Sequence, residues 1–114
     1  MLTTKSKGLL LYIVSHCERI EKKIKNQTYK NFLEDEDFQE VLCFNILQIG
    51  ELANKFDNEF LKSHDEVPWI EMKAMRNKIV HGYGTIDKNV VWLTAIKDIG
   101  ELRKYCEKTL KENK

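Results

Sequence analysis

Apolar residues recur every three or four positions along most of the chain, which is the spacing of one face of an α-helix. The first such pattern covers residues 5–25 and ends in a lysine-rich turn, where cations complement the negative end of a helix dipole. We expect an amphipathic helix here, a break at residues 26–28, and room for a short helical turn over residues 29–37. The apolar positions of this first helix are Leu9, Leu10, Ile13, Cys17, Ile20 and Ile24.

A second helix is predicted over residues 38–56, and a capping signal stands at its start. Asp37 is followed three residues later by Glu40, a pair that resembles a capping box and would satisfy free amides at the helix start. The polar residues 57–67 then form a connection of ordinary loop length.

Three residues of the second helix are unusual for a simple packing face. Asn45 lies within the apolar stripe, so its amide must be paired, and we favour a structural network over a ligand. Gly50 interrupts the helix-forming residues and indicates the close approach of another helix. Glu51 is either an ordinary carboxylate at the edge of the stripe or a partner for a cation such as Arg76.

The remaining pattern predicts two more helices. Pro68 fits the first position of a third helix, where its missing amide hydrogen is not needed, and Gly82 and Gly84 end that helix. Asp87 caps a long final helix whose apolar stripe continues to Leu110. Because no alternating strand pattern appears, we expect an all-α fold: an antiparallel up-and-down bundle of four main helices, with room for a fifth short one.

The composition is typical of one ordered domain. A chain of 114 residues with 42% hydrophobic residues and one proline can close a single core, so we expect residues 1–114 to form one domain. The formal net charge of +1 gives no strong electrostatic case for nucleic acid or an anionic membrane. No segment approaches the roughly 20 apolar residues of a membrane-spanning helix, so no membrane partner is expected.

The cysteines and histidines give no sign of a metal site. They lack CxxC spacing and any other ligand spacing, so we predict no metal and no other cofactor. Widely separated cysteines of this kind indicate reduced thiols that serve in packing, which is typical of a cytoplasmic protein. These residues are Cys17, Cys43, Cys106, His16, His64 and His81.

Residues 75–84 are the strongest candidate for chemistry. Arg76 and His81 are five positions apart, about 140° around an ideal helix, so a straight helix would not put both side chains on one face. Either the helix ends or loosens near His81, as Gly82 allows, or a second subunit completes the site. His81 and Tyr83 are two residues apart, which in extended backbone directs both to the same side.

An arginine and a histidine without an acidic metal cluster suit the cleavage of RNA. A guanidinium can bind a phosphate and stabilise its charge, while an imidazole can move protons near neutral pH. The 2′-hydroxyl of RNA is an internal nucleophile, so no metal is required, and DNA, which lacks it, is not an expected partner. Lys73 and Lys78 are the predicted RNA contacts. On residue types and spacing alone, the competing interpretation is stronger: Arg76 pairs with a carboxylate and His81 merely ends a helix.

A resemblance to a known family changes that balance. Residues 76–81 (RNKIVH) resemble the R-x4-6-H signature of the HEPN superfamily, and residues 81–83 (HGY) extend it to the R-x4-H-x-Y form of the HepT-like toxins. Three further segments are similar to that branch in the same order. They are residues 49–53 (IGELA), 67–69 (VPW) and 91–92 (VW). The resemblance therefore covers nearly the whole chain.

The resemblance implies a homodimer of helical bundles whose two motifs face one cleft, and a metal-independent endoribonuclease acting on RNA. It also implies the toxin of a toxin–antitoxin pair, whose partner, a minimal nucleotidyltransferase antitoxin, adenylylates the motif tyrosine, here Tyr83. In these terms Arg76 binds the scissile phosphate and His81 is the general acid or base. Asn77 and Glu51 are the supporting polar residues.

The alternative comes from a different functional class. The chain could be a non-catalytic subunit that binds a nucleotide or substrate and presents it to a separately encoded nucleotidyltransferase. HEPN domains also serve in that way, and a shared fold does not establish activity. The complete set of Arg76, His81 and Tyr83 favours the ribonuclease, because a pure binding subunit would not need it.

Overall fold

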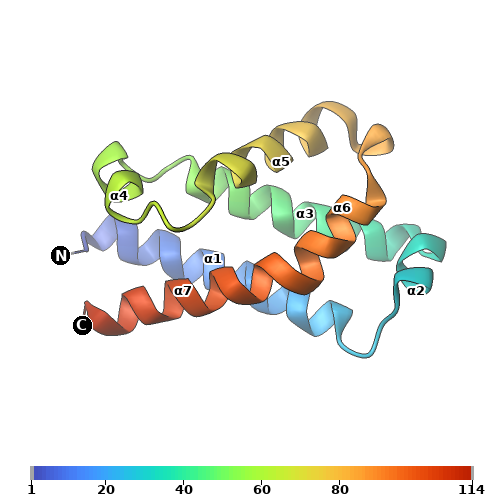
Figure 1. Ribbon diagram of the computed structural model, residues 1–114, viewed down its shortest axis with the longest axis horizontal. Helices are drawn as coiled ribbons and strands as arrows, with labels where there is room; N and C mark the ends of the chain where they lie inside the picture. Colours follow the sequence, from blue (N-terminus) through green and yellow to red (C-terminus); the bar gives the residue numbers. More distant parts are fainter. Residues whose placement is uncertain (1, 114) are drawn as a thin grey trace.

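The protein is an all-helical bundle, as the sequence predicts (Figure 1). The computed structural model describes residues 2–113, apart from the side chain of Tyr83, and none of these residues forms a β-strand. Successive main helices run in opposite directions, so the two termini lie at the same end (Figure 1). The four main segments are α1 (Thr4–Ile24), α3 (Glu36–Ala53), α5 (Trp69–Gly82) and the continuous run of α6 (Lys88–Leu93), η2 (Thr94–Asp98) and α7 (Ile99–Glu112).

The second main helix begins slightly earlier than predicted. A short helix, α2 (Tyr29–Glu34), occupies the place of the expected helical turn, and α3 follows it almost directly. The N-cap of α3 is Asp35, whose side chain accepts a hydrogen bond from the Phe38 amide at 3.1 Å. The predicted cap at Asp37 is wrong. Asp37 instead lies in the first turn, where its negative charge favours the positive end of the helix dipole.

The connection predicted over residues 57–67 contains a helix, α4 (Asn58–Ser63), so the prediction of a plain loop is wrong there. Phe60 is buried and its ring stacks on Phe56, with centroids 4.1 Å apart. Phe56 precedes α4, so this stacking fastens the helix to the turn before it, in a segment that is otherwise largely polar. After it, α5 begins at Trp69, and the carbonyl of Pro68 accepts the first helical hydrogen bond, from Met72 at 3.1 Å.

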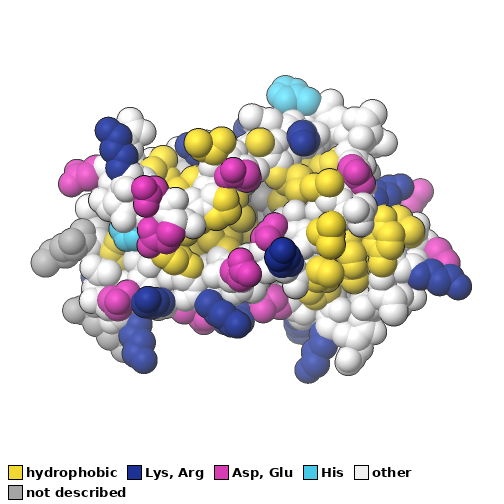
Figure 2. Space-filling view, in the orientation of Figure 1, with side chains coloured by type: hydrophobic (Ala, Val, Ile, Leu, Met, Phe, Trp, Pro, Cys, Tyr) yellow, Lys and Arg dark blue, Asp and Glu magenta, His cyan; other side chains and the backbone are white. Residues whose placement is uncertain are grey.

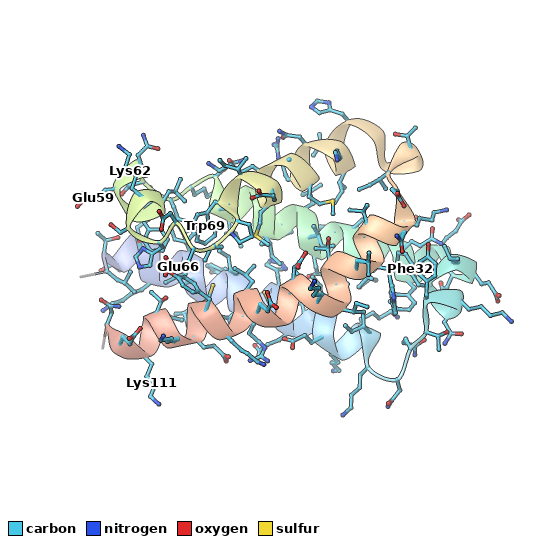
Figure 3. All side chains as sticks on the ribbon, in the orientation of Figure 1. Phe32, Glu59, Lys62, Glu66, Trp69 and Lys111 are labelled. Atoms are coloured by element: carbon cyan, nitrogen blue, oxygen red, sulfur yellow. The ribbon has the colours of Figure 1, made fainter. Side chains whose placement is uncertain are left out.

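The core is closed at each end of the bundle by aromatic rings. At one end Phe32 packs against Phe38 and Trp92, with centroids 5.4 and 5.5 Å away. At the other end Trp69 packs against Phe56 at 5.3 Å, and Figure 3 labels Phe32 and Trp69 at these two positions. Between the clusters, α1 packs against both α3 and α7, whereas α5 packs mainly against α3. The candidate catalytic helix is therefore supported chiefly from one side.

Within this core, the buried side chain of Asn45 is hydrogen-bonded and the cysteines pack as free thiols. Asn45 Oδ1 lies 2.8 Å from His16 Nδ1, and Asn45 Nδ2 donates to the carbonyl oxygen of Val41 at 2.8 Å. The predicted structural network at Asn45 is thus confirmed. The three cysteines are free and buried, and burial raises the pKa of the Cys43 thiol to about 11, so it packs as a small, protonated group. No helix within residues 2–113 has the length and apolar character needed to cross a bilayer.

Candidate active site

The candidate motif lies at the carboxyl end of α5, and the helix ends where the sequence predicts. α5 ends at Gly82 and leads into one 3-10 turn, η1 (Tyr83–Thr85). The Thr85 hydroxyl donates to the carbonyl oxygen of Gly82 at 2.9 Å. A Cβ atom at position 82 would lie only 2.5 Å from this hydroxyl oxygen, so glycine permits the turn. The backbone of Tyr83 therefore directly follows the helix end, while its side chain lies outside the described part.

Arg76 is held by a carboxylate from the neighbouring helix. Its Nε donates to Glu51 Oε1 of α3, and the two side chains are 28% and 36% exposed. The alternative in which Glu51 is the partner of Arg76 is therefore confirmed. Arg76 Nη1 donates to Asn77 Oδ1 at 2.7 Å. Nη2 has no hydrogen-bond partner among the described residues, so it is available for an anion while Glu51 and Asn77 fix the plane of the guanidinium.

Gly50 lies against Arg76, because α3 and α5 make their closest approach there. A Cβ atom at Gly50 would overlap Arg76 Cβ and would lie 3.0 Å from the carbonyl oxygen of Met72. The absence of a side chain at position 50 lets the backbones come together, which brings Glu51 within reach of Arg76. The close helix approach predicted from this glycine is confirmed.

His81 is exposed in the last turn of α5 and forms no ion pair within the described part of the chain. Because α5 remains helical through Gly82, ideal geometry still separates Arg76 and His81 by about 140° around the helix axis. The helix end near His81 is confirmed, but it comes too late to turn His81 onto the face of Arg76. Among residues 2–113, no hydrogen bond links Arg76 to His81 within one subunit.

The other predicted site residues lie on different sides of α5. Lys73 precedes Arg76 and Asn77 by three and four positions, so it shares their face of the helix. Lys78 instead lines a groove on the far side of α5, beside Met75. Of the two predicted RNA contacts, only Lys73 is on the face of Arg76.

Two exposed apolar residues beside this face were not among the predicted site residues. Phe44 of α3 is 55% exposed and Val80 of α5 is 49% exposed. The sequence carries a signal for both, because Phe44 precedes Glu51 by seven positions and Val80 follows Arg76 by four, which are same-face spacings on a helix. The candidate site therefore has an apolar border.

Metal-ligating side chains do not cluster near the motif. Nowhere in the described part of the chain do three or more His, Cys, Asp or Glu side chains lie together in a way that could hold a metal ion. The chemistry available in this region is that of a fixed guanidinium and an exposed imidazole.

Comparisons with known proteins identify the family to which the chain belongs. The family described as "Ribonuclease HepT-like" matches residues 13–109. A protein of Caldanaerobacter subterraneus subsp. tengcongensis named "Putative RNase" is 30% identical over 105 residues, which are 92% of this chain and 94% of the relative. "Probable ribonuclease HepT" of Thermococcus cleftensis is 34% identical over 105 residues, which are 92% and 96% of the two chains.

A third relative, a protein of Methanocaldococcus jannaschii that is also named "Putative RNase", is 28% identical over 93% of this chain and 88% of its own. No solved structure matches the chain. The family match spans the motif helix, its support on α3 and the final helix alike. The chain therefore belongs to the HepT-like ribonuclease family.

Proposed function

We propose that this protein is a homodimeric, metal-independent endoribonuclease and the toxin of a toxin–antitoxin pair. One observation carries the proposal: Arg76 is held by Glu51 and Asn77, and its Nη2 has no partner among the described residues, in a chain that belongs to a ribonuclease family. The pairing of Arg76 with a carboxylate does not argue against catalysis, because it orients the guanidinium and leaves Nη2 for a phosphate oxygen.

The reaction proposed for these residues needs only the substrate's own nucleophile. The 2′-oxygen of the RNA attacks the adjacent phosphorus and the bond to the 5′-oxygen breaks, leaving a 2′,3′-cyclic phosphate and a 5′-hydroxyl. Arg76 stabilises the added negative charge on the phosphorane, which is greatest in the transition state. His81 takes the proton of the 2′-hydroxyl or supplies one to the leaving oxygen. Lys73 contacts a neighbouring phosphate.

A second subunit completes the site in this proposal. Arg76 and His81 are about 140° apart on one continuous helix, so one phosphate reaches both side chains most simply when they come from different subunits. The exposed Phe44 and Val80 give the face beside Arg76 the apolar area that a subunit contact buries. A two-fold axis near Val80 would bring the two α5 helices together with their motifs on one cleft.

Control by a nucleotidyltransferase antitoxin forms the last part of the proposal. Tyr83 is two residues after His81 and belongs to the turn that ends the motif helix. An AMP group on its hydroxyl would bring a negative phosphodiester and a bulky base next to His81 and Arg76. The added group would then compete with the RNA phosphate for the same cations.

Cleavage of RNA by the purified full chain in excess EDTA tests the proposal. Wild type should cleave single-stranded RNA and leave cyclic phosphate ends, while Arg76→Ala and His81→Ala should each be about 100-fold slower or worse. Lys111→Ala is the matched control, because Lys111 is a cation at the terminal end of α7 (Figure 3) and should leave cleavage unchanged. Undiminished cleavage by both motif variants would sink the assignment, and RNA or nucleotide binding without cleavage would favour the non-catalytic subunit.

A further inference from the structure

A groove separates α5 from the α6–α7 run, on the flank of α5 that carries Lys78. It encloses about 310 Å³, and its floor is apolar. Figure 2 shows hydrophobic side chains exposed in this region between the upper helix, α5, and the front helix, α7. The groove exists because α5 packs mainly against α3 and makes little contact with the final helices. The residues that form its floor are Ile46, Ile49, Met72, Met75 and Ile99.

The groove continues toward the end of the bundle that holds the termini. A second depression of about 240 Å³ shares Pro68, Met72 and Asp98 with the first and adds Val67 and Leu102 to the apolar floor. The two depressions together form one open track beside α5 from Pro68 to Lys78, here named the α5–α7 groove. An extended track of this kind suits a chain segment better than a compact small molecule.

The walls of the α5–α7 groove are acidic. Glu71, Asp98 and Glu101 line it and take no part in the ion pairs found among the described residues. Glu66, labelled in Figure 3 between the start of α5 and helix α7, adds a fourth carboxylate and accepts a hydrogen bond from Tyr105 at 2.7 Å. Lys78 is the one cation that lines the groove in the described part of the chain. This excess of negative charge disfavours RNA and anionic lipid as occupants.

A local irregularity of the backbone coincides with the groove. The turn η2 is π-helical, and two of its residues, Thr94 and Asp98, line the wall. The Thr94 hydroxyl donates to the carbonyl oxygen of Val90 at 2.8 Å, and the Thr94 amide donates to the same oxygen. Single π turns inside α-helices occur frequently at functional sites.

We propose that the α5–α7 groove binds a basic amphipathic helix of a partner protein. The apolar face of that helix would cover Met72 and Met75, and its lysine or arginine side chains would pair with Glu71, Asp98 and Glu101. The charge complementarity selects this occupant over a neutral or acidic one. Neither Arg76 nor His81 lines the groove, so the inference does not depend on the proposed ribonuclease activity.

The chain contains its own reporters for this surface. Of its three methionines, Met72 and Met75 line the groove and the third is Met1. The full chain labelled with 13C in the methionine methyl groups is titrated with a synthetic peptide of leucine and lysine, arranged as an amphipathic helix of roughly four turns. The expected result is a saturable shift of two methionine signals, which Met72→Leu and Met75→Leu assign.

Two comparisons make the test decisive. A scrambled peptide and a leucine–glutamate peptide should bind at least about tenfold more weakly than the basic peptide. The double variant Glu71→Lys/Asp98→Lys should lose at least about tenfold in affinity, whereas the control Glu59→Lys/Glu112→Lys, with the same charge change outside the groove, should bind like wild type.

Several results would overturn the proposal. They are the absence of saturable shifts at Met72 and Met75, equal binding of the basic and acidic peptides, or equal weakening by the two double variants. Shifts of these signals that depend on protein concentration without peptide would assign the groove to a second copy of the chain and would also overturn it.

Discussion

Gly50 lies where α3 and α5 touch, and its lack of a side chain sets the distance between Glu51 and Arg76. The obstacle to any larger residue is rigid, because the nearest atoms include Arg76 Cβ and the carbonyl oxygen of Met72. Neither atom can move without moving α5. The position of the candidate catalytic arginine therefore depends on a residue that has no chemistry of its own.

The variant Gly50→Ala should be destabilised by up to about 2 kcal/mol, because overpacking against backbone costs about 1–3 kcal/mol and alanine gains only roughly 1 kcal/mol in a helix. Gly8→Ala in α1 is the matched control, since a Cβ atom there meets nothing within 4 Å, and it should be stabilised by about 1 kcal/mol. Urea unfolding measures both. Equal changes in the free energy of unfolding of the two variants would mean that an alanine at position 50 causes no overpacking. Cleavage of RNA should fall in Gly50→Ala only.

Individual residues also show where sequence reasoning about the site succeeds and where it fails. The pairing of Glu51 with Arg76 can be predicted from the sequence. Gly50 indicates that another helix approaches there, and Glu51 next to it is a carboxylate that a cation on that helix can reach. That Lys78 lies on a different side of α5 also follows from the sequence, because it comes two positions after Arg76 and residues at that spacing do not share a helix face. The groove that Lys78 lines does not follow from the sequence, because it depends on which neighbours α5 packs against.

At the level of the elements, the four main helices follow from their apolar period, and the end of α5 follows from Gly82. The helix starts are less predictable, because Asp35 and Asp37 both stand near the start of α3 and either could cap it. Asp35 is the cap since its backbone is extended, with φ −128° and ψ 103°. Helix α4 does not follow from the sequence pattern, because its anchor, the stacking of Phe60 on Phe56, joins it to a residue outside the helix.

Replacing each of these two aspartates by alanine should lower the free energy of unfolding by different amounts. Asp35→Ala removes the acceptor of the Phe38 amide and should lower the free energy of unfolding by about 1 kcal/mol. Asp37→Ala loses only a favourable charge at the helix start, which is worth roughly 0.3–1 kcal/mol and is screened by salt. Thermal unfolding at low and high salt distinguishes them. If Asp37→Ala destabilises the protein more than Asp35→Ala does at high salt, the assigned cap is wrong.

For the whole molecule, the decisive question is how many subunits form one site. The sequence left two arrangements open, and the continuous α5 argues for the one that uses a second subunit, since it keeps Arg76 and His81 on different faces. No periodicity within one chain can reveal that arrangement, because it depends on a symmetry between chains.

Complementation between two inactive variants tests the shared site. Arg76→Ala and His81→Ala are unfolded together, refolded as a mixture and assayed with RNA. If a site combines Arg76 of one subunit with His81 of the other, each mixed dimer keeps one intact site. Since half of the dimers are mixed, about a quarter of wild-type activity should return.

The control is the same mixture in which one variant also carries Val80→Glu, which should prevent the apolar contact and abolish the recovery. No recovery in the first mixture, with dimers present by sedimentation, would mean that each site is formed within one subunit.

The one-sided support of α5 has a further consequence for how the molecule opens. Since α1 is packed between α3 and α7 while α5 rests mainly on α3, α5 should detach in a local opening that costs less free energy than global unfolding. Amide hydrogen exchange followed by mass spectrometry should show peptides of α5 exchanging faster than peptides of α1. Activity should then be lost on heating before the far-ultraviolet circular dichroism signal of the bundle. Equal protection of α1 and α5 would indicate one cooperative unit instead.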